Sequence, residues 1–236
     1  MRDFRSWARV VTRIVAEHAA LAIGVCALAL VVYWRTTVSY SSDVLANASF
    51  DPTWRSMLVA GTTIGRADAP IHVVEFADFE CPACARMYAT LVAAQQRYGD
   101  SITITFVHFP LAYHAFAIVA ARASECARDQ QQFEPMYEAL FSHHDSLSAI
   151  NAQRFAHMAG LSDTALFGSC MARRDTAARI LEGISLGKAL RLRGTPTVFV
   201  NGWRFSTALP PARLDAIVRA IADRRARDSI HPVAQP

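Results

Sequence analysis

The sequence predicts an α/β fold in which a long all-helical segment interrupts a mixed β-sheet, with one apolar helix ahead of it. Three stretches carry this prediction: residues 71–109 have the pattern strand, helix, strand; residues 112–192 have no strand pattern; and residues 197–205 hold two apolar runs around Asn201-Gly202. A helical crossover joins parallel strands, whereas Asn-Gly between two such runs indicates an antiparallel hairpin. We therefore expect parallel and antiparallel strands in one sheet.

The N-terminal apolar run predicts a transmembrane helix over residues 14–34. Residues 19–34 (AALAIGVCALALVVYW) carry no charge. The full stretch makes about 32 Å of helix, which is enough to cross a bilayer. Four arginines precede the run and only Arg35 follows it closely. The positive-inside rule therefore places the N-terminus in the cytoplasm and the rest of the chain outside it.

A cleavable signal peptide, with a cleavage site at Ala46-Asn47-Ala48, is the alternative to this anchor. The site lies 11 residues beyond the apolar run, which is farther than a usual cleavage region. We therefore favour a retained, single-pass anchor in the inner (cytoplasmic) membrane. Both alternatives place the remainder of the chain in an extracytoplasmic compartment such as the periplasm.

The charge distribution gives no sign of a nucleic-acid partner. Residues 1–35 account for +3 of the net charge of +4, so the rest of the chain is close to neutral. Without a basic stripe, nucleic-acid binding is not expected. The basic N-terminus indicates membrane topology.

Periodicity and turn residues predict the secondary structure. Residues 71–77 (IHVVEFA) are rich in β-branched and aromatic side chains and predict a buried strand, and residues 101–109 alternate as a second one. A helix is expected over 82–98, with Pro82 at its first position and Gly99 beyond its end. The other expected elements are a short helix at 51–59, helical segments at 112–128, 133–141, 151–159, 162–172 and 176–190, strands at 197–200 and 203–205, and a last helix at 212–225.

These elements define the expected domains in chain order. A turn-rich stretch, 61–70, leads into the first long strand. The domains are a cytoplasmic N-terminus (1–13), a transmembrane anchor (14–34), a tether with a short helix (35–60), the first part of the sheet domain (61–111), a helical insertion (112–192), the second part of the sheet domain (193–227) and a tail (228–236).

Cys81 and Cys84 form a C-P-A-C motif at the start of the helix expected at 82–98. A thiol at the cap of this helix faces unpaired backbone N–H groups and the positive end of the helix dipole, and both favour the thiolate. Cys84 lies three residues on, within disulfide distance but more covered. We therefore expect Cys81 to be the attacking sulfur and Cys84 the resolving one, while Pro82 and Ala83 tune the thiolate.

Two other interpretations of this motif fit less well. Zinc needs two further ligands at matching spacing, but the sequence has no second C-x-x-C, and His143 and His144 are adjacent rather than three to five residues apart. A structural staple gains little stability, because the loop that it closes is so short. We expect a redox dithiol that requires neither a metal nor another cofactor.

The stretches VVEFADFECPAC (73–84) and GTPTVFVNG (194–202) carry a specific resemblance. The sequence resembles the DsbA-like branch of the thioredoxin superfamily, extracytoplasmic thiol:disulfide oxidoreductases with a helical domain inserted into a thioredoxin-like fold. The resemblance covers roughly residues 60–225, including FVHFPLAYH and SECARDQQQFEPMYEALF. It implies a periplasmic catalytic domain.

The resemblance implies a cis peptide at Thr195-Pro196 that faces the cysteines. These two residues would receive an extended substrate backbone and keep metal off the thiols, and Pro82 and Ala83 would border the same substrate-binding surface. A trans proline at the start of an edge strand is the alternative. Four more side chains are candidates for this groove, although ordinary packing accounts for each of them as well: Phe79, His108, His114 and Trp203.

Glu75 is the third expected catalytic residue. It lies six residues before Cys81 in an apolar strand, where a carboxylate is costly to bury unless it is paired or protonated. The resemblance implies that an acid at this place lies beneath the dithiol and relays protons for the resolving cysteine. The alternative is a glutamate at the strand edge that points to solvent.

The sequence departs from the most oxidising members of that family at Ala83, where they carry a histidine. Without that ring Cys81 lacks one stabilising partner. Asp78 and Glu80 act in the same direction, since like charge disfavours a thiolate. We therefore expect a less strongly oxidising dithiol.

Two further cysteines are expected to form a structural disulfide. Of the five cysteines, Cys26 lies in the predicted span, which leaves Cys126 and Cys170 in the helical insertion on the oxidising side. Such a bond closes a loop of 44 residues, which is worth up to about 4 kcal/mol in the chain-entropy model. The alternative is two separate buried thiols.

The function expected from these features is thiol:disulfide exchange that forms disulfide bonds in exported proteins. The expected partners are exported cysteine-containing proteins, a membrane redox partner that resets the dithiol, and the membrane itself through residues 14–34. A reductase or isomerase is an alternative, although residues 35–60 are too short for the N-terminal domain through which isomerases of this superfamily usually dimerise. A membrane-tethered binding or holdase module is another, but binding alone needs neither the two cysteines nor Thr195-Pro196.

Overall fold

The computed structural model describes residues 18, 23–33, 44–45, 48–149, 152–173 and 177–230, without the side chains of 148–149 and 227–230. The chain divides into two compact units, Met1–Ala46 and Asn47–Pro236.

In the first unit, residues 23–33 are helical. Within the part of the chain that the structure describes, no helix combines the length and the apolar character that a membrane span requires. Both ends of the span predicted at 14–34, and the predicted cytoplasmic residues 1–13, lie outside the described residues. The anchor therefore stays a prediction.

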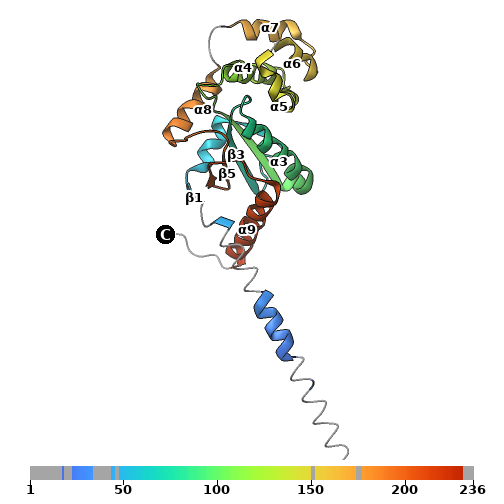
Figure 1. Ribbon diagram of the computed structural model, residues 1–236, viewed down its shortest axis with the longest axis vertical. Coiled ribbons are helices and arrows are strands. Elements are labelled where there is room, and N and C mark those ends of the chain that lie inside the picture. The colour runs from blue at the N-terminus through green and yellow to red at the C-terminus, as the bar shows by residue number, and fades with distance from the viewer. Residues whose placement is uncertain are drawn as a thin grey trace, which may run out of the picture. The chain divides into compact units, whose positions relative to one another are not determined.

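A mixed sheet forms the centre of the second unit (Figure 1). Its described strands follow the order β1-β6-β5-β3-β4-β2. β3 and β4 are parallel and are connected through the helix α3 (Pro82–Tyr98). The other pairs are antiparallel, and the pair of β5 and β6 is the hairpin that Asn201-Gly202 predicts. The strands are β1 (Ser49–Phe50), β2 (Thr62–Ile64), β3 (Ile71–Ala77), β4 (Ile102–His108), β5 (Thr197–Val200) and β6 (Trp203–Phe205).

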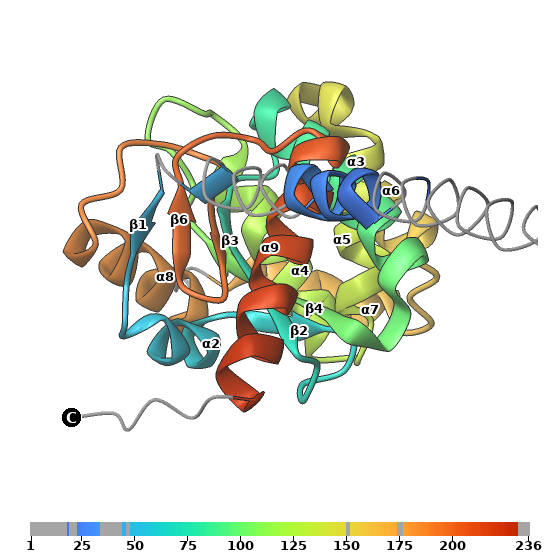
Figure 2. The same ribbon diagram turned by 90° about the horizontal axis from the view of Figure 1, so that it is seen from below.

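β3, the strand that leads to Cys81, is covered on both faces. On one face Val74 and Phe76 belong to a buried cluster that includes Met57 of the short helix α2 (Met57–Ala60). On the other face lie α3 and the last helix, α9 (Pro211–Ile230), which Figure 2 shows running across the sheet. A strand covered on both faces is apolar at nearly every position, which explains the continuous run in its sequence.

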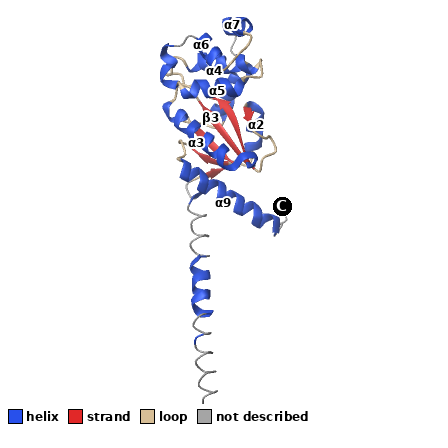
Figure 3. Cartoon of the chain, turned by 90° about the vertical axis from the view of Figure 1, so that its right-hand side faces the viewer, coloured by secondary structure: helices blue, strands red, loops and turns tan. Residues whose placement is uncertain are grey.

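Every regular element described between β4 and β5 is helical, as the sequence predicts. α4 packs on α5, α6 and α7, and Figure 3 shows this group at one end of the sheet, while α8 returns to β4. These elements are α4 (Ala117–Arg128), α5 (Phe133–Ser142), the 3₁₀ helix η3 (His144–Ala149), α6 (Ala152–Met158), α7 (Thr164–Ala172) and α8 (Ala178–Ala189).

The structure corrects the predicted start of the helical segment. The helix expected from residue 112 begins only at Ala117. The residues before it are held in a loop, because the N–H of Leu111 donates to Asp78 and the N–H of Phe116 donates to Glu80. Helix propensity alone contains no information about these distant acceptors.

Further predicted boundaries differ from the structure. β1 lies in the predicted tether and β2 in the predicted turn-rich stretch. With two and three residues they are too short to show alternation, and they form by pairing with β6 and β4. The last helix reaches Ile230 instead of ending at residue 225, since Ala226 and Arg227 are good helix formers and no glycine or proline follows before Pro232.

Candidate active site

Cys81 caps the N-terminus of α3. Its backbone is extended (φ −76°, ψ 118°), Pro82 opens the helix, and the Cys81 carbonyl accepts the N–H groups of Cys84 and Ala85 at 2.9 and 3.1 Å. The Cys81 side chain retains a small exposed area, 7%, whereas Cys84 is fully covered. Both are free thiols. The helix end therefore presents one sulfur to the surface and places the other behind it, as the motif predicts.

The two thiols differ in acidity. The pKa of Cys81 is lowered to about 5, first because the Cys84 thiol donates a hydrogen bond to its sulfur, next by Thr195, and then by the backbone N–H groups of Cys84 and Ala83. Burial opposes this shift without cancelling it. The pKa of Cys84 is raised well above its usual range, chiefly by burial. At neutral pH Cys81 is thus a thiolate and Cys84 a thiol, which suits attack by Cys81 and resolution by Cys84.

The loop before β5 brings Thr195 and Pro196 to this sulfur. The Thr195-Pro196 peptide bond is cis, as the resemblance implies. The Cys81 sulfur lies 3.4 Å from the Thr195 carbonyl oxygen. Around it, Pro82 is exposed and Ala83 half-buried, so both border the surface that a substrate would meet.

Glu75 is fully buried in β3, between β4 and β5. The strand-edge alternative is therefore wrong. Neither carboxyl oxygen has a hydrogen-bond partner among the described residues. Burial raises the pKa of Glu75 to about 8, and the charge on Cys81 adds to the shift. Near neutral pH Glu75 is thus a protonated acid that can exchange a proton with the dithiol.

The two acids of the Cys81 loop bind backbone groups. Asp78 accepts hydrogen bonds from the N–H groups of Glu80 and Leu111, both at 2.8 Å, while its own carbonyl accepts the Cys81 N–H. Glu80 accepts the N–H of Phe116 at 2.6 Å. From the sequence, these acids are expected only to place like charge near the thiolate. Their structural role depends on contacts with residues 111–116, which the sequence does not reveal. The sequence indicates only the local turn, because an aspartate can accept the N–H of the residue two positions on.

The four groove candidates have ordinary packing or pairing partners. Phe79 is buried and stacks on Phe106 at 4.9 Å. His108 is buried against Glu125, and Trp203 packs on Phe50 at the β1 edge. His114 is 16% exposed and pairs with Asp78.

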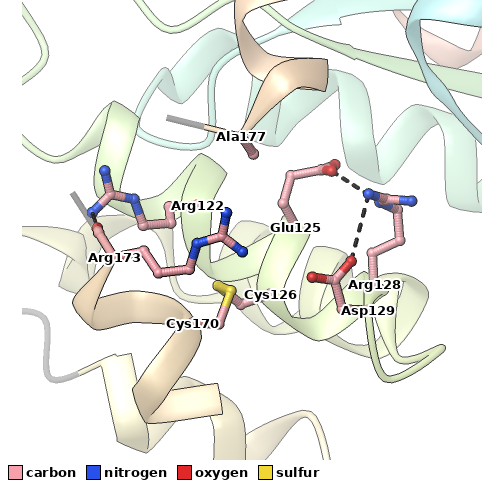
Figure 4. A pocket seen from close by; sticks show the side chains of 8 residues that line it. All are labelled: Arg122, Glu125, Cys126, Arg128, Asp129, Cys170, Arg173 and Ala177. Atoms are coloured by element: carbon pink, nitrogen blue, oxygen red, sulfur yellow. Dashed lines mark hydrogen bonds and ion pairs between the residues drawn. A yellow bond between two sulfur atoms is a disulfide. The ribbon is translucent and has the colours of Figure 1, made fainter. Parts of the chain in front are cut away.

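Cys126 and Cys170 form a disulfide between α4 and α7, so the alternative of two separate buried thiols is wrong. A small cavity of about 70 Å³ adjoins it, where Arg122 donates to the Arg173 carbonyl at 2.9 Å (Figure 4). The cavity lining contains no residue of the dithiol site. In the described residues no three His, Cys, Asp or Glu side chains are grouped so as to hold a metal ion.

A family model described as thioredoxin matches residues 58–220, which is more than half of the chain. The chain belongs to the thioredoxin family. Both cysteines, Glu75 and the Thr195-Pro196 turn lie within the matched segment.

Solved structures of the thioredoxin type resemble this chain. A thioredoxin-like oxidoreductase from Silicibacter pomeroyi is 26% identical, with a TM-score of 0.57 over 75% of this chain and 96% of that one. The α-DsbA1 protein of Wolbachia pipientis is 21% identical, with a TM-score of 0.60 over 71% and 94%. The likeness to α-DsbA1 shows the fold, and the oxidoreductase neighbour supports thiol–disulfide oxidoreductase chemistry in general.

Curated relatives are proteins named Na(+)/H(+) antiporter NhaA. One from Mycolicibacterium gilvum is 39% identical over 145 residues, 59% of this chain and 23% of its own length. Another, from Salinispora tropica, is 33% identical over 171 residues, 71% of this chain and 25% of its own length. The chain thus spans about a quarter of the length of these relatives.

Proposed function

We propose that this thioredoxin-family protein is a DsbA-like thiol:disulfide oxidoreductase that forms disulfide bonds in exported proteins. The observation that carries the proposal is the asymmetry of the dithiol. Cys81 is acidic and reaches the surface beside Thr195, whereas Cys84 is covered and its pKa is raised in part by the charge of the buried Glu75.

The reaction follows from this geometry. In the disulfide form, a client thiolate attacks the Cys81 sulfur, the Cys81–Cys84 bond breaks, and the Cys84 sulfur takes the proton of Glu75. A second client thiolate then attacks the client sulfur of the mixed disulfide and releases Cys81 as a stable thiolate. The client loses two electrons, and the protein, now a dithiol, passes them to a membrane redox partner.

The proposal includes an extracytoplasmic location and an anchor at residues 14–34. The Cys126–Cys170 disulfide supports it, since structural disulfides persist in oxidising compartments. Reporters that are active only outside the cytoplasm test it: a fusion after residue 40 should be active and one before residue 14 inactive. The reverse pattern would remove the compartment from the proposal.

Sodium–proton antiport is not part of the proposal. That name belongs to proteins of which this chain spans about a quarter. The proposal rests instead on the two thiols and Glu75.

One experiment tests the proposed activity directly. The oxidised protein is mixed with a reduced, unfolded client, and client disulfides are counted by mass spectrometry. We expect one client disulfide per protein dithiol formed. If the oxidised protein instead forms no client disulfides, and the reduced protein removes them under a glutathione buffer that keeps the dithiol reduced, the alternative of a reductase or isomerase is correct.

A further inference from the structure

Within the described part of the chain, two buried polar groups without hydrogen-bond partners interact electrostatically with each other. One is the Glu75 carboxyl, and the other is the hydroxyl of Tyr137 on α5. Both side chains are more than nine-tenths buried, at 0% and 5% exposed. Buried hydroxyls and carboxyls are nearly always hydrogen-bonded, so an unpartnered pair in one place points to a function.

Ring packing places Tyr137 on the same face of the sheet as Glu75. Phe106 is the β4 residue aligned with Glu75 across the parallel pair, so the two side chains are neighbours on one face. The Tyr137 ring packs edge-on against Phe106, with centroids 5.3 Å apart. It packs equally close to Tyr88 of α3, the helix that carries Cys84.

The pKa of the Tyr137 phenol depends on its burial and on the charges of neighbouring groups. Burial raises its pKa well above the usual range, and the charges of Glu75, Tyr88 and Cys84 raise it further. The phenol therefore keeps its proton at any physiological pH and can donate it in a hydrogen bond. An ionised carboxylate, by contrast, can only accept.

We propose that Tyr137 is a positioning residue for proton transfer at Glu75. When the Glu75 proton passes to Cys84, the Tyr137 hydroxyl donates a hydrogen bond to the carboxylate that remains. The inference rests on the proposed function. When the Cys81–Cys84 bond breaks, the electron pair stays on the Cys84 sulfur, the proton moves from Glu75 to that sulfur, and one negative charge remains on Glu75. A carboxylate in this apolar surrounding needs a donor, and Tyr137 supplies one from the helical segment.

The test compares Tyr137→Phe with Tyr88→Phe as its matched control. Both changes remove one hydroxyl from the same group of stacked rings, but the Tyr88 hydroxyl interacts with Ser142. The Glu75 carboxyl is titrated by ¹³C NMR in the reduced protein, a readout that needs no activity. The free energy of a hydrogen bond to a charged group corresponds to a pKa shift of about one to two units. The pKa of Glu75 should therefore rise by that amount in Tyr137→Phe and remain unchanged in Tyr88→Phe.

The rate at which a small thiol opens the Cys81–Cys84 disulfide provides a second test. At pH 7, release of Cys84 from the disulfide by a small thiol should slow about tenfold in Tyr137→Phe. In a Glu75→Gln background the same change should have no further effect, since no carboxylate forms. An unchanged Glu75 pKa in folded Tyr137→Phe, or an equal shift in Tyr88→Phe, overturns the inference.

The test still gives an answer if the variant does not fold or if the wild-type protein shows no exchange. If Tyr137→Phe does not fold, the Tyr137 phenol is titrated by ¹³C-tyrosine NMR in Glu75→Gln. Removal of the carboxylate charge should lower the pKa of Tyr137 in this variant. An unchanged phenol titration overturns the inference. If the wild-type protein shows no exchange with clients, the proposed function fails, but the NMR titrations still decide whether Tyr137 and Glu75 interact.

Discussion

The imidazole Nδ1 of His114 lies 2.7 Å from the Oδ2 atom of Asp78. The N–H of Leu111 donates a hydrogen bond to the same oxygen. Together these two contacts hold the loop that precedes α4 against the loop that carries Cys81. Asp78 is therefore a structural support of the active site and not only a charge near it.

Replacing Asp78 by alanine should lower the free energy of unfolding by about 3 kcal/mol, because it leaves the N–H groups of Glu80 and Leu111 without their acceptor. Urea unfolding of the oxidised protein measures this. Asp129→Ala is the control, since that side chain is 57% exposed and pairs only loosely with Arg128 at 3.6 Å. Equal losses in the two variants would contradict the role assigned to Asp78.

The Cys81 thiolate should form with a midpoint near pH 5, because the Cys84 thiol and the N-terminal N–H groups of α3 stabilise it. Absorbance at 240 nm of the reduced protein, with Cys81→Ser as the blank, gives this titration. Cys84→Ser should accumulate mixed disulfides with clients, since no resolving sulfur remains. Full turnover by Cys84→Ser would reverse the assigned roles.

Glu75→Gln should stabilise the protein increasingly as the pH rises. The pKa of Glu75 is raised in the folded state from 4.5 to about 8. Its contribution to stability is therefore complete below pH 4.5 and is lost as the pH rises through about 8. The gap between the variant and the wild type should widen across this window to on the order of 4–5 kcal/mol. Denaturant unfolding at several pH values measures it, and a gap independent of pH would show that Glu75 is ionised in the folded state.

Replacing both Cys126 and Cys170 by serine should cost about 4 kcal/mol of unfolding free energy in the chain-entropy model, because the disulfide closes a loop of 44 residues. The exchange rate of the dithiol should change little, since the cavity beside this disulfide contains no residue of that site. Non-reducing peptide mapping of the wild type provides the control. Recovery of both cysteines as free thiols would contradict the structure.

Ala83→His should raise the reduction potential and lower the Cys81 pKa together. A histidine between the cysteines adds a partner for the thiolate, worth some tens of millivolts if it supplies one charge-assisted hydrogen bond of about 1.5–3 kcal/mol. The wild-type potential should lie between roughly −270 and −120 mV, measured by equilibration with glutathione. A wild-type value at or above −120 mV would show that other groups set the potential.

The local features of this protein follow from its sequence alone. β3, α3, β5 and β6 begin and end where the sequence predicts, because runs of β-branched and aromatic residues, Pro82 at the first helical position and the Asn201-Gly202 turn act over a few residues. The place of Cys81 at a helix N-terminus follows from the same local signals, whereas its acidity also depends on Thr195 from a distant loop.

Which distant groups meet at the site depends on the tertiary structure. Asp78 meets Leu111 and His114, and Tyr137 reaches the face that carries Glu75, across sequence separations that no periodicity spans. β1 and β2 likewise exist only through their partners. The physical reason is that a hydrogen bond or a buried contact needs both partners in place, and here each second partner comes from another part of the chain.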